Sequence, residues 1–440
     1  MLKRSTMPQR TTFPKPPGGA ARASLAGPYL ALCLALCLAL CLPAQAQAPT
    51  QTGGRELVFG MSAAFSGPAR GLGLEYYQGL LASFEHTNAQ GGAGGWRLVL
   101  SRRDDGYDPL PALSNTIDFV EQERVFALLG YVGTPAMARV LPLLKRYESE
   151  HMALLFPFTG ADVLRERPYD AFVFNLRASY IDETRGLVEA LLATGKRRIA
   201  VFHQADVYGR NGWDGVRRAL KVHGLSIVAD ATYRRGAAYT QDFRREVSLL
   251  QAAAPDAIVT VGTGPACAAF VRDVRDAGLT TLIVTLSPAD ADNMVKFLLA
   301  QTRMTGRDYT SGLVFSQVVP CYDDKSLPAA ALYRQAMDQL RVAPPVRLVN
   351  EEYTPNRYSF VSFEGFLAGQ VLAEAVRRMA DAPTRARLLA VLAGLKNLDI
   401  GIREKVSFGP GRNQGLRQTY LTVYRQGGFE SLTDLAGVQP

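Results

Sequence analysis

Two threonines follow apolar runs of strand length in the stretch 126–159. Phe126–Gly130 and Met152–Phe156 are these runs, and a helical pattern lies between them. Two strands joined by a helix form a right-handed βαβ unit of a parallel sheet, which binds ligands beyond the carboxyl ends of its strands. Thr134 would offer a hydroxyl at a helix N-terminus, which attracts carboxylates. We therefore predict that Thr134, Phe158 and Thr159 form half of a small-molecule site.

Simpler interpretations of these residues stay open. Thr134 could only cap its helix, and Thr159 could only stabilise its turn. Tyr208 could pack on the helix that it opens. Arg177 is expected to brace a hinge by a hydrogen bond to Asp182, with a ligand contact as the alternative.

Catalytic chemistry finds little support in the sequence. Cys267 as a nucleophile would need a positioned base, and the four histidines form no HExxH or Cys–His pattern. Gly262-Thr263-Gly264 begins a dinucleotide fingerprint, but Cys267 takes the position of its third glycine. We expect no enzyme, no cofactor and no metal, and keep an α/β enzyme as a minor alternative.

The composition is that of a soluble globular chain with a basic leader. The 440 residues carry a formal charge of +9. Five of the 49 basic residues lie within the first 22 positions, and their removal leaves 44 bases against 40 acids, a net charge of +4. Because no basic run is interleaved with aromatic residues, nucleic acid is not an expected partner.

The leader has the pattern of a secretory signal. Its basic segment precedes the apolar run Tyr29–Leu42, and Ala44-Gln45-Ala46 and Ala46-Gln47-Ala48 then offer small-x-small cleavage sites. As a helix the apolar run would span about 21 Å, short of a hydrocarbon core of about 30 Å. We predict that residues 1–48 are a signal peptide, cleaved near Ala46 or Ala48, which sends the protein to the periplasm. Cys267 and Cys321, which remain after cleavage, are expected to be buried rather than bridged.

Strands and helices alternate through most of the mature chain, and the alternation restarts near Ser179. This pattern predicts an α/β fold with two doubly wound layers. Two long helical patterns, Leu327–Gln339 and Tyr358–Met379, and a shorter one follow, and the chain ends in β-like segments. The predicted strands are Glu56–Met61, Trp96–Arg102, Phe126–Gly130, Met152–Phe156, Ala171–Leu176, Arg198–Phe202, Leu225–Ala231, Ala257–Val261, Thr281–Leu286, Gly312–Val319, Val406–Phe408 and Arg417–Tyr424.

An ordered series of short motifs, behind a signal peptide, resembles one known family. The chain is similar to type I periplasmic substrate-binding proteins of ABC transporters, the leucine/isoleucine/valine-binding-protein group, over about Glu56 to Tyr424. The motifs are Ser66-Gly67-Pro68, Asp104-Asp105, Gly130–Thr134, Pro157–Gly160, Phe174–Ser179, Ala205–Gly209 and Asp273–Gly278.

The resemblance implies two Rossmann-like lobes joined by a hinge with three crossover strands. One lobe would contain residues 55–176 plus 320–400, and the other residues 178–317 plus 403–440. The crossovers would fall near Asn175–Ser179, Ser316–Cys321 and Arg403–Phe408.

The resemblance further implies that a small polar ligand binds between the lobes and that the closed form docks on a membrane permease. The protein is expected to act as a monomer, and a role in feeding a receptor stays open. Ala289 stands where the family places the acid that pairs with an amino acid's ammonium group, so Asp290 or Asp292 is a candidate substitute, and an amino acid, a carboxylate or an amide stays open as the ligand. The expected ligand-binding residues are Ser66, Thr134, Phe158, Thr159, Tyr180, Tyr208, Thr263 and Asp290.

Overall fold

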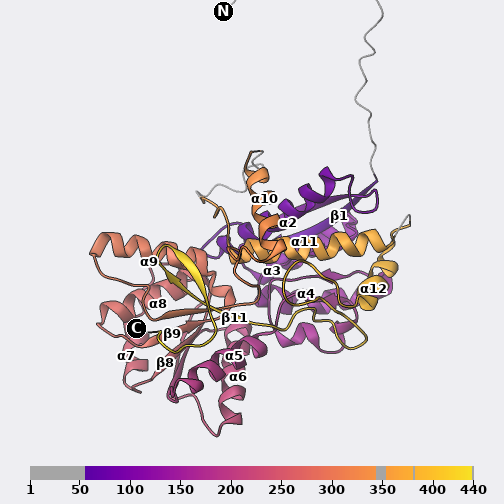
Figure 1. The fold of residues 1–440 in the computed structure, drawn as a ribbon. Helices are drawn as coiled ribbons and strands as arrows, with labels where there is room; N and C mark the ends of the chain where they lie inside the picture. The colour runs from indigo at the N-terminus through magenta and orange to yellow at the C-terminus, as the bar shows by residue number, and fades with distance from the viewer. Residues whose placement is uncertain (1–54, 343–352, 380–381, 439–440) are drawn as a thin grey trace, which may run out of the picture. The chain divides into compact units, whose positions relative to one another are not determined.

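The computed structural model describes residues 55–342, 353–379 and 382–438 (Figure 1). The predicted signal peptide, residues 1–48, lies outside these residues. Among the helices of the described ranges, none combines the length and the apolar character that crossing a membrane requires.

The first sheet has five strands in the order β2-β1-β3-β4-β5, and every neighbouring pair is parallel. Strands β3, β4 and β5 are short and fully buried, which explains why they appear in the sequence as continuous apolar runs. The strands are β1 (Glu56–Ala63), β2 (Arg97–Asp104), β3 (Ala127–Leu129), β4 (Leu154–Leu155) and β5 (Val173–Phe174).

The second sheet has seven strands in the order β12-β11-β10-β9-β8-β6-β7. The strands from β6 to β10 pair in parallel, and β11 and β12 extend the sheet as an antiparallel hairpin. They are β6 (Ile199–Gln204), β7 (Ala229–Tyr233), β8 (Ala257–Val261), β9 (Leu282–Thr285), β10 (Leu313–Gln317), β11 (Tyr420–Arg425) and β12 (Gly428–Leu432).

Each sheet and its helices form a lobe (Figure 1). The first lobe contains α2 (Arg70–Ala89), α3 (Pro109–Ile117), α4 (Thr134–Arg146), α10 (Pro328–Val342), α11 (Phe360–Met379) and α12 (Arg385–Gly394). The second lobe contains α5 (Tyr180–Ala193), α6 (Val207–Val222), α7 (Arg244–Gln251), α8 (Gly264–Asp276) and α9 (Ala291–Thr305).

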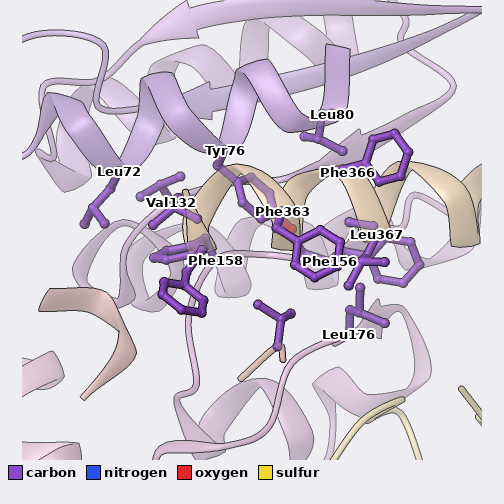
Figure 2. Close-up of a cluster of buried hydrophobic side chains, with 14 of the residues drawn as sticks. Leu72, Tyr76, Leu80, Val132, Phe156, Phe158, Leu176, Phe363, Phe366 and Leu367 are labelled. Carbon is purple, nitrogen blue, oxygen red and sulfur yellow. The ribbon is translucent and has the colours of Figure 1, made fainter. Parts of the chain in front are cut away.

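Helices α2 and α11, far apart in sequence, pack closely over the first sheet (Figure 2). A Cβ atom on Gly79 would lie 1.8 Å from the carbonyl oxygen of Ser362, and one on Gly365 would lie 2.4 Å from that of Tyr76. Only glycine permits such an approach of the two backbones. Below this contact, Phe156 and Phe158 from the strand ends join the buried side chains of both helices.

Three elements of the second lobe differ from the sequence prediction. Helix α9 was not predicted, because its start at Pro288–Asn293 has the composition of a loop, and the side chain of Asp290 in fact caps it. Strand β12 was not predicted either, since its hairpin turns at Gln426-Gly427, both with positive φ, and glutamine is a weak signal for such a turn. Strand β7 begins four residues later than predicted, at Ala229, because Leu225–Val228 precede the paired segment. In addition, the β-like segment Val406–Phe408, which was expected in the second lobe, has a single bridge, from Leu398 to Val406, and its Phe408 ring packs on Phe174 of the first sheet.

Candidate functional site

A cavity of about 450 Å³ lies where the two lobes meet, and we call it the interlobe cavity. The first lobe contributes the start of α2 and the turn before it, residues 67–72. The second lobe contributes residues 238–240, 263–265 and the start of α9, and Tyr353 comes from the segment before α11. Its volume falls within the range of about 300–1,000 Å³ that is usual for small-molecule sites.

Asp290 supplies an acidic side chain to the cavity wall. Its backbone is left-handed (φ 54°), and its Oδ2 accepts a hydrogen bond from Asn293 Nδ2 at 2.6 Å. The residue is 3% exposed, and burial raises the pKa of its carboxyl group to about 7.

Asp292, the other candidate substitute acid, does not line the cavity. Its carboxylate accepts hydrogen bonds from Tyr322 Oη at 2.7 Å and from the backbone N–H of Phe360 at 2.9 Å. Burial raises its pKa to about 8. Asp292 thus connects α9 to the start of α11, and Asp290 is the acid that faces the interlobe cavity.

Glu75, a buried glutamate that was not among the predicted residues, connects α2 to Asp290. Glu75 accepts hydrogen bonds from Tyr353 Oη at 2.7 Å and from the backbone N–H of Asn356 at 2.8 Å. Tyr353 Oη in turn accepts from Asn293 Nδ2 at 2.8 Å, so a chain of hydrogen bonds links the two lobes through to Asp290. Burial raises the pKa of Glu75. The available signal was an acid among the apolar residues of a helix.

Aromatic rings form another part of the cavity wall. Tyr239 and Phe297 stack with ring centroids 4.9 Å apart and planes 17° apart. The guanidinium carbon of Arg272 lies over the Tyr239 ring, 5.1 Å from its centroid. Thr263, a predicted ligand residue, also lines the cavity.

The structure brings four other predicted residues together in a second cluster. Thr134 Oγ1 and Thr159 Oγ1 lie 2.7 Å apart, and Tyr180 Oη lies 3.4 Å from each. The Tyr208 ring lies beside that of Tyr180, with centroids 5.2 Å apart. The alternative role of Thr134 as a helix cap is wrong, because Gly133 occupies the cap position and the threonine hydroxyl contacts Thr159 instead.

Tyrosine rings cover both glycine turns of this cluster. A Cβ on Gly133 would lie 2.5 Å from Tyr107 Cε2, and one on Gly160 would lie 2.5 Å from Tyr180 Cδ1. The two threonines are at most 3% exposed. The cluster is therefore filled by side chains and does not line the interlobe cavity.

The last two predicted residues, Ser66 and Phe158, lie beside the interlobe cavity and beside the threonine cluster, respectively. Ser66 immediately precedes the cavity-lining turn, and its backbone N–H donates to Asp104 Oδ1 at 3.2 Å. Phe158 follows β4, and its ring packs edge-on against Tyr76 with centroids 5.3 Å apart.

Arg177 lies between the lobes, but its predicted bond to Asp182 is absent from the described contacts. Its Nη2 donates to Ser287 Oγ and lies 3.9 Å from Glu183 Oε1, and its Nε lies 3.6 Å from Glu364 Oε1. Asp182 instead closes the capping box at the start of α5. Burial raises the pKa of Glu364 to about 7. Arg177 is thus the cation of a buried ionic cluster that joins α5, from the second lobe, to α11, from the first.

The two cysteines of the described chain, Cys267 and Cys321, are free and buried, as expected.

Comparisons with known proteins agree with this architecture. A family model described as periplasmic binding protein matches residues 56–428. The crystal structure of a possible leucine/isoleucine/valine-binding protein from Rhodopirellula baltica is 30% identical and superposes with a TM-score of 0.77, covering 89% of this chain and 99% of that one.

Two curated relatives match over shorter stretches. An amino acid binding protein from Pseudomonas aeruginosa is 24% identical over 59% of this chain and 67% of its own length. A Leu/Ile/Val-binding protein from Citrobacter freundii is 27% identical over 52% of this chain and 60% of its own length.

The family match, the two lobes with their sheets and the similarity to these proteins confirm the predicted resemblance and fold class. The chain belongs to the periplasmic binding protein family, in its type I, leucine/isoleucine/valine-binding-protein-like group, and is a substrate-binding protein rather than an enzyme.

Proposed function

We propose that this protein captures a small polar solute in the interlobe cavity and delivers it to the permease of an ABC importer. The observation that supports this most directly is the cavity itself, which takes its walls from both lobes. A ligand that contacts both walls stabilises the closed arrangement over an open one. Relatives named as amino acid and Leu/Ile/Val-binding proteins support an organic solute of similar size.

The hinge of this closure is proposed to lie at three crossovers between the lobes. The chain passes from β5 to α5 across residues 175–179, and from β10 to α10 across residues 318–327. We place the third crossover near Gln414 rather than at the expected Arg403–Phe408. The Gln414 side chain bonds Arg165 Nε, in the first lobe, at 2.6 Å and Asp182 Oδ2, in the second, at 2.9 Å. Phe408 supports this placement, since its ring packs on Phe174 of the first sheet, with centroids 5.3 Å apart.

The working location is proposed to be the periplasm, after removal of the leader near Ala46 or Ala48. Intact-mass measurement of the exported protein is expected to give an N-terminus at Gln47 or Pro49. A protein that keeps residues 1–48 after export would contradict this processing.

A thermal-shift screen with small-angle scattering tests solute capture. The screen contains leucine, phenylalanine, 3-phenylpropionate, 2-phenylethylamine and short amides. One class is expected to raise Tm with concentration and to reduce the radius of gyration. Ala238→Trp fills the cavity from a half-buried loop position and is expected to abolish the shift, whereas Leu249→Trp, on the exposed face of α7, is not. Equal binding by wild type and Ala238→Trp would refute the cavity as the site.

Uptake measurements test the partner. A strain that lacks the protein is expected to lose uptake of the identified solute and to regain it with the wild type but not with Ala238→Trp. Retained uptake with a lost chemotactic response would favour the receptor alternative.

A further inference from the structure

Few charged side chains line the interlobe cavity, and one carboxylate oxygen among them has room for a further hydrogen bond. Among the described residues of its wall, Asp290 and Arg70 are the charged ones, and Arg70 Nη1 donates to the carbonyl oxygen of Gly67 at 3.0 Å. Asp290 Oδ2 accepts the short bond from Asn293 Nδ2, but the contact of Oδ1 with the backbone N–H of Asn293 is long, at 3.5 Å. A carboxylate oxygen can accept two hydrogen bonds, so Oδ1 keeps capacity for a donor in the cavity.

The aromatic part of the wall offers the ring of Phe297 as a surface for a ligand. The guanidinium carbon of Arg272 and the ring centroid of Phe297 lie 5.1 Å and 4.9 Å from the centroid of the Tyr239 ring. Phe297 stacks on Tyr239 and also lines the cavity. A planar group of the ligand can continue this stack.

The hydroxyl groups expected to receive a carboxylate are engaged elsewhere. Thr134 and Thr159 bond each other and Tyr180 outside the cavity wall. A free carboxylate placed beside Asp290 would be repelled by its like charge, and Arg70 is the one cation of the described wall that could offset this repulsion.

We propose that the interlobe cavity takes a primary amine carried on a ring-bearing apolar body, with the nitrogen on Asp290 and the ring on Phe297. This inference rests on the proposed solute-binding function and specifies its ligand class. It makes Asp290 the residue that selects the head group and Phe297 the residue that selects the body.

The test compares two probes that share a phenyl ring and differ in charge, 2-phenylethylamine and 3-phenylpropionate. Binding is measured by calorimetry above pH 7, where Asp290, with a pKa of about 7, is ionised. The variant Asp290→Asn keeps the left-handed backbone and the helix cap, because asparagine suits both, and it removes the charge while replacing one acceptor oxygen by an NH2 group. Asp292→Asn is the matched control, since that acid is also buried, in the first turn of α9, but lies outside the cavity wall.

The amine is expected to bind the wild type and Asp292→Asn alike and to lose about ten- to hundredfold in affinity in Asp290→Asn, the usual effect of losing a charge-assisted bond. Phe297→Leu is expected to bind the amine several-fold more weakly, and 3-phenylpropionate is expected not to bind the wild type.

Three results would overturn the inference: tighter binding of 3-phenylpropionate than of the amine, equal affinity of the amine for wild type and Asp290→Asn, or equal losses in the Asp290→Asn and Asp292→Asn variants. If leucine binds wild type and Asp290→Asn equally while the amine does not bind, solute capture stands and the amine inference fails. If no solute of the screen binds, both fail.

Discussion

The substitution Gly71→Ala is expected to weaken closure of the lobes on a ligand without lowering the stability of the unliganded protein. The residue lies in the first turn of α2, against the start of α9 from the other lobe. A Cβ there would lie 2.7 Å from Asn293 Nδ2 and 2.9 Å from Asp290 Oδ2, distances that real Cβ atoms do not adopt. Gly71→Ala therefore forces the closed lobes apart or breaks the bond between these two side chains.

The added methyl group is expected to raise the free energy of the closed form and not that of an open form. Overpacking of this kind costs about 1–3 kcal/mol, which corresponds to a loss of roughly five- to 150-fold in ligand affinity when closure accompanies binding. An open form lacks the contact, and alanine within a helix is more stable than glycine by up to about 1 kcal/mol. Affinity is thus expected to fall while the Tm of the unliganded protein does not.

Calorimetry with 2-phenylethylamine, the melting curve and the radius of gyration with and without the amine measure these effects. Asn293→Ala provides the second arm of a double-mutant cycle, because it removes the nearer of the two clashing atoms. Gly71→Ala is expected to cost less affinity in that background. Unchanged affinity in a folded Gly71→Ala variant with unchanged compaction would show that this contact does not form on closure.

Raising the pH from about 5 to about 8 is expected to lower Tm. The reason is that Asp290 and Asp292 have folded-state pKa values of about 7 and about 8, above the ordinary value of an aspartate. The stability that their protons contribute is fully present below the ordinary carboxyl pKa and is lost as the pH rises through the folded-state pKa values. Asp292→Asn should make Tm less dependent on pH. A wild-type Tm that does not change with pH would contradict the raised pKa values. Arg177→Met leaves Glu183 and Glu364 buried without their cation and is expected to cost about 3–5 kcal/mol in urea unfolding. Glu183→Gln and Glu364→Gln added to it should restore most of that loss, and a single variant as stable as the wild type would show that the cluster is not ionised. Cys267 and Cys321 are buried and free, so in the protein without residues 1–48 a thiol reagent should react with two groups only after unfolding, and a reductant should leave Tm unchanged. Rapid labelling of this native protein would argue against their burial.

The alternating architecture could be predicted because buried parallel strands leave a simple trace. Strands β3 and β4 appear as apolar runs on either side of α4, and they pair directly in the first sheet. The turns after them were expected to meet, and Thr134 and Thr159 do lie at hydrogen-bond distance. This follows from topology, since parallel strands end at one edge of a sheet.

The details of the cavity could not be predicted, because they depend on partners far away in the chain. Glu75 is stabilised by Tyr353 and Asn356, whose positions follow only from the packing of α11 on α2. The choice between Asp290 and Asp292 depends on where α9 begins, and the left-handed backbone of Asp290 fixes it. Whether the eight predicted residues bind ligand stays a prediction, and the structure places Thr263 and Asp290 in the cavity wall.

The close packing of α2 on α11 also has a consequence for biogenesis. The chain must be synthesised beyond Ser362 and Phe366 before Gly79 can meet them, so α2 lacks this partner until late in elongation. Contacts of such long sequence separation form slowly, because the intervening loop must first be closed. A nascent chain whose first lobe cannot fold early would stay extended enough to pass through a narrow translocation channel, which is compatible with the proposed export to the periplasm.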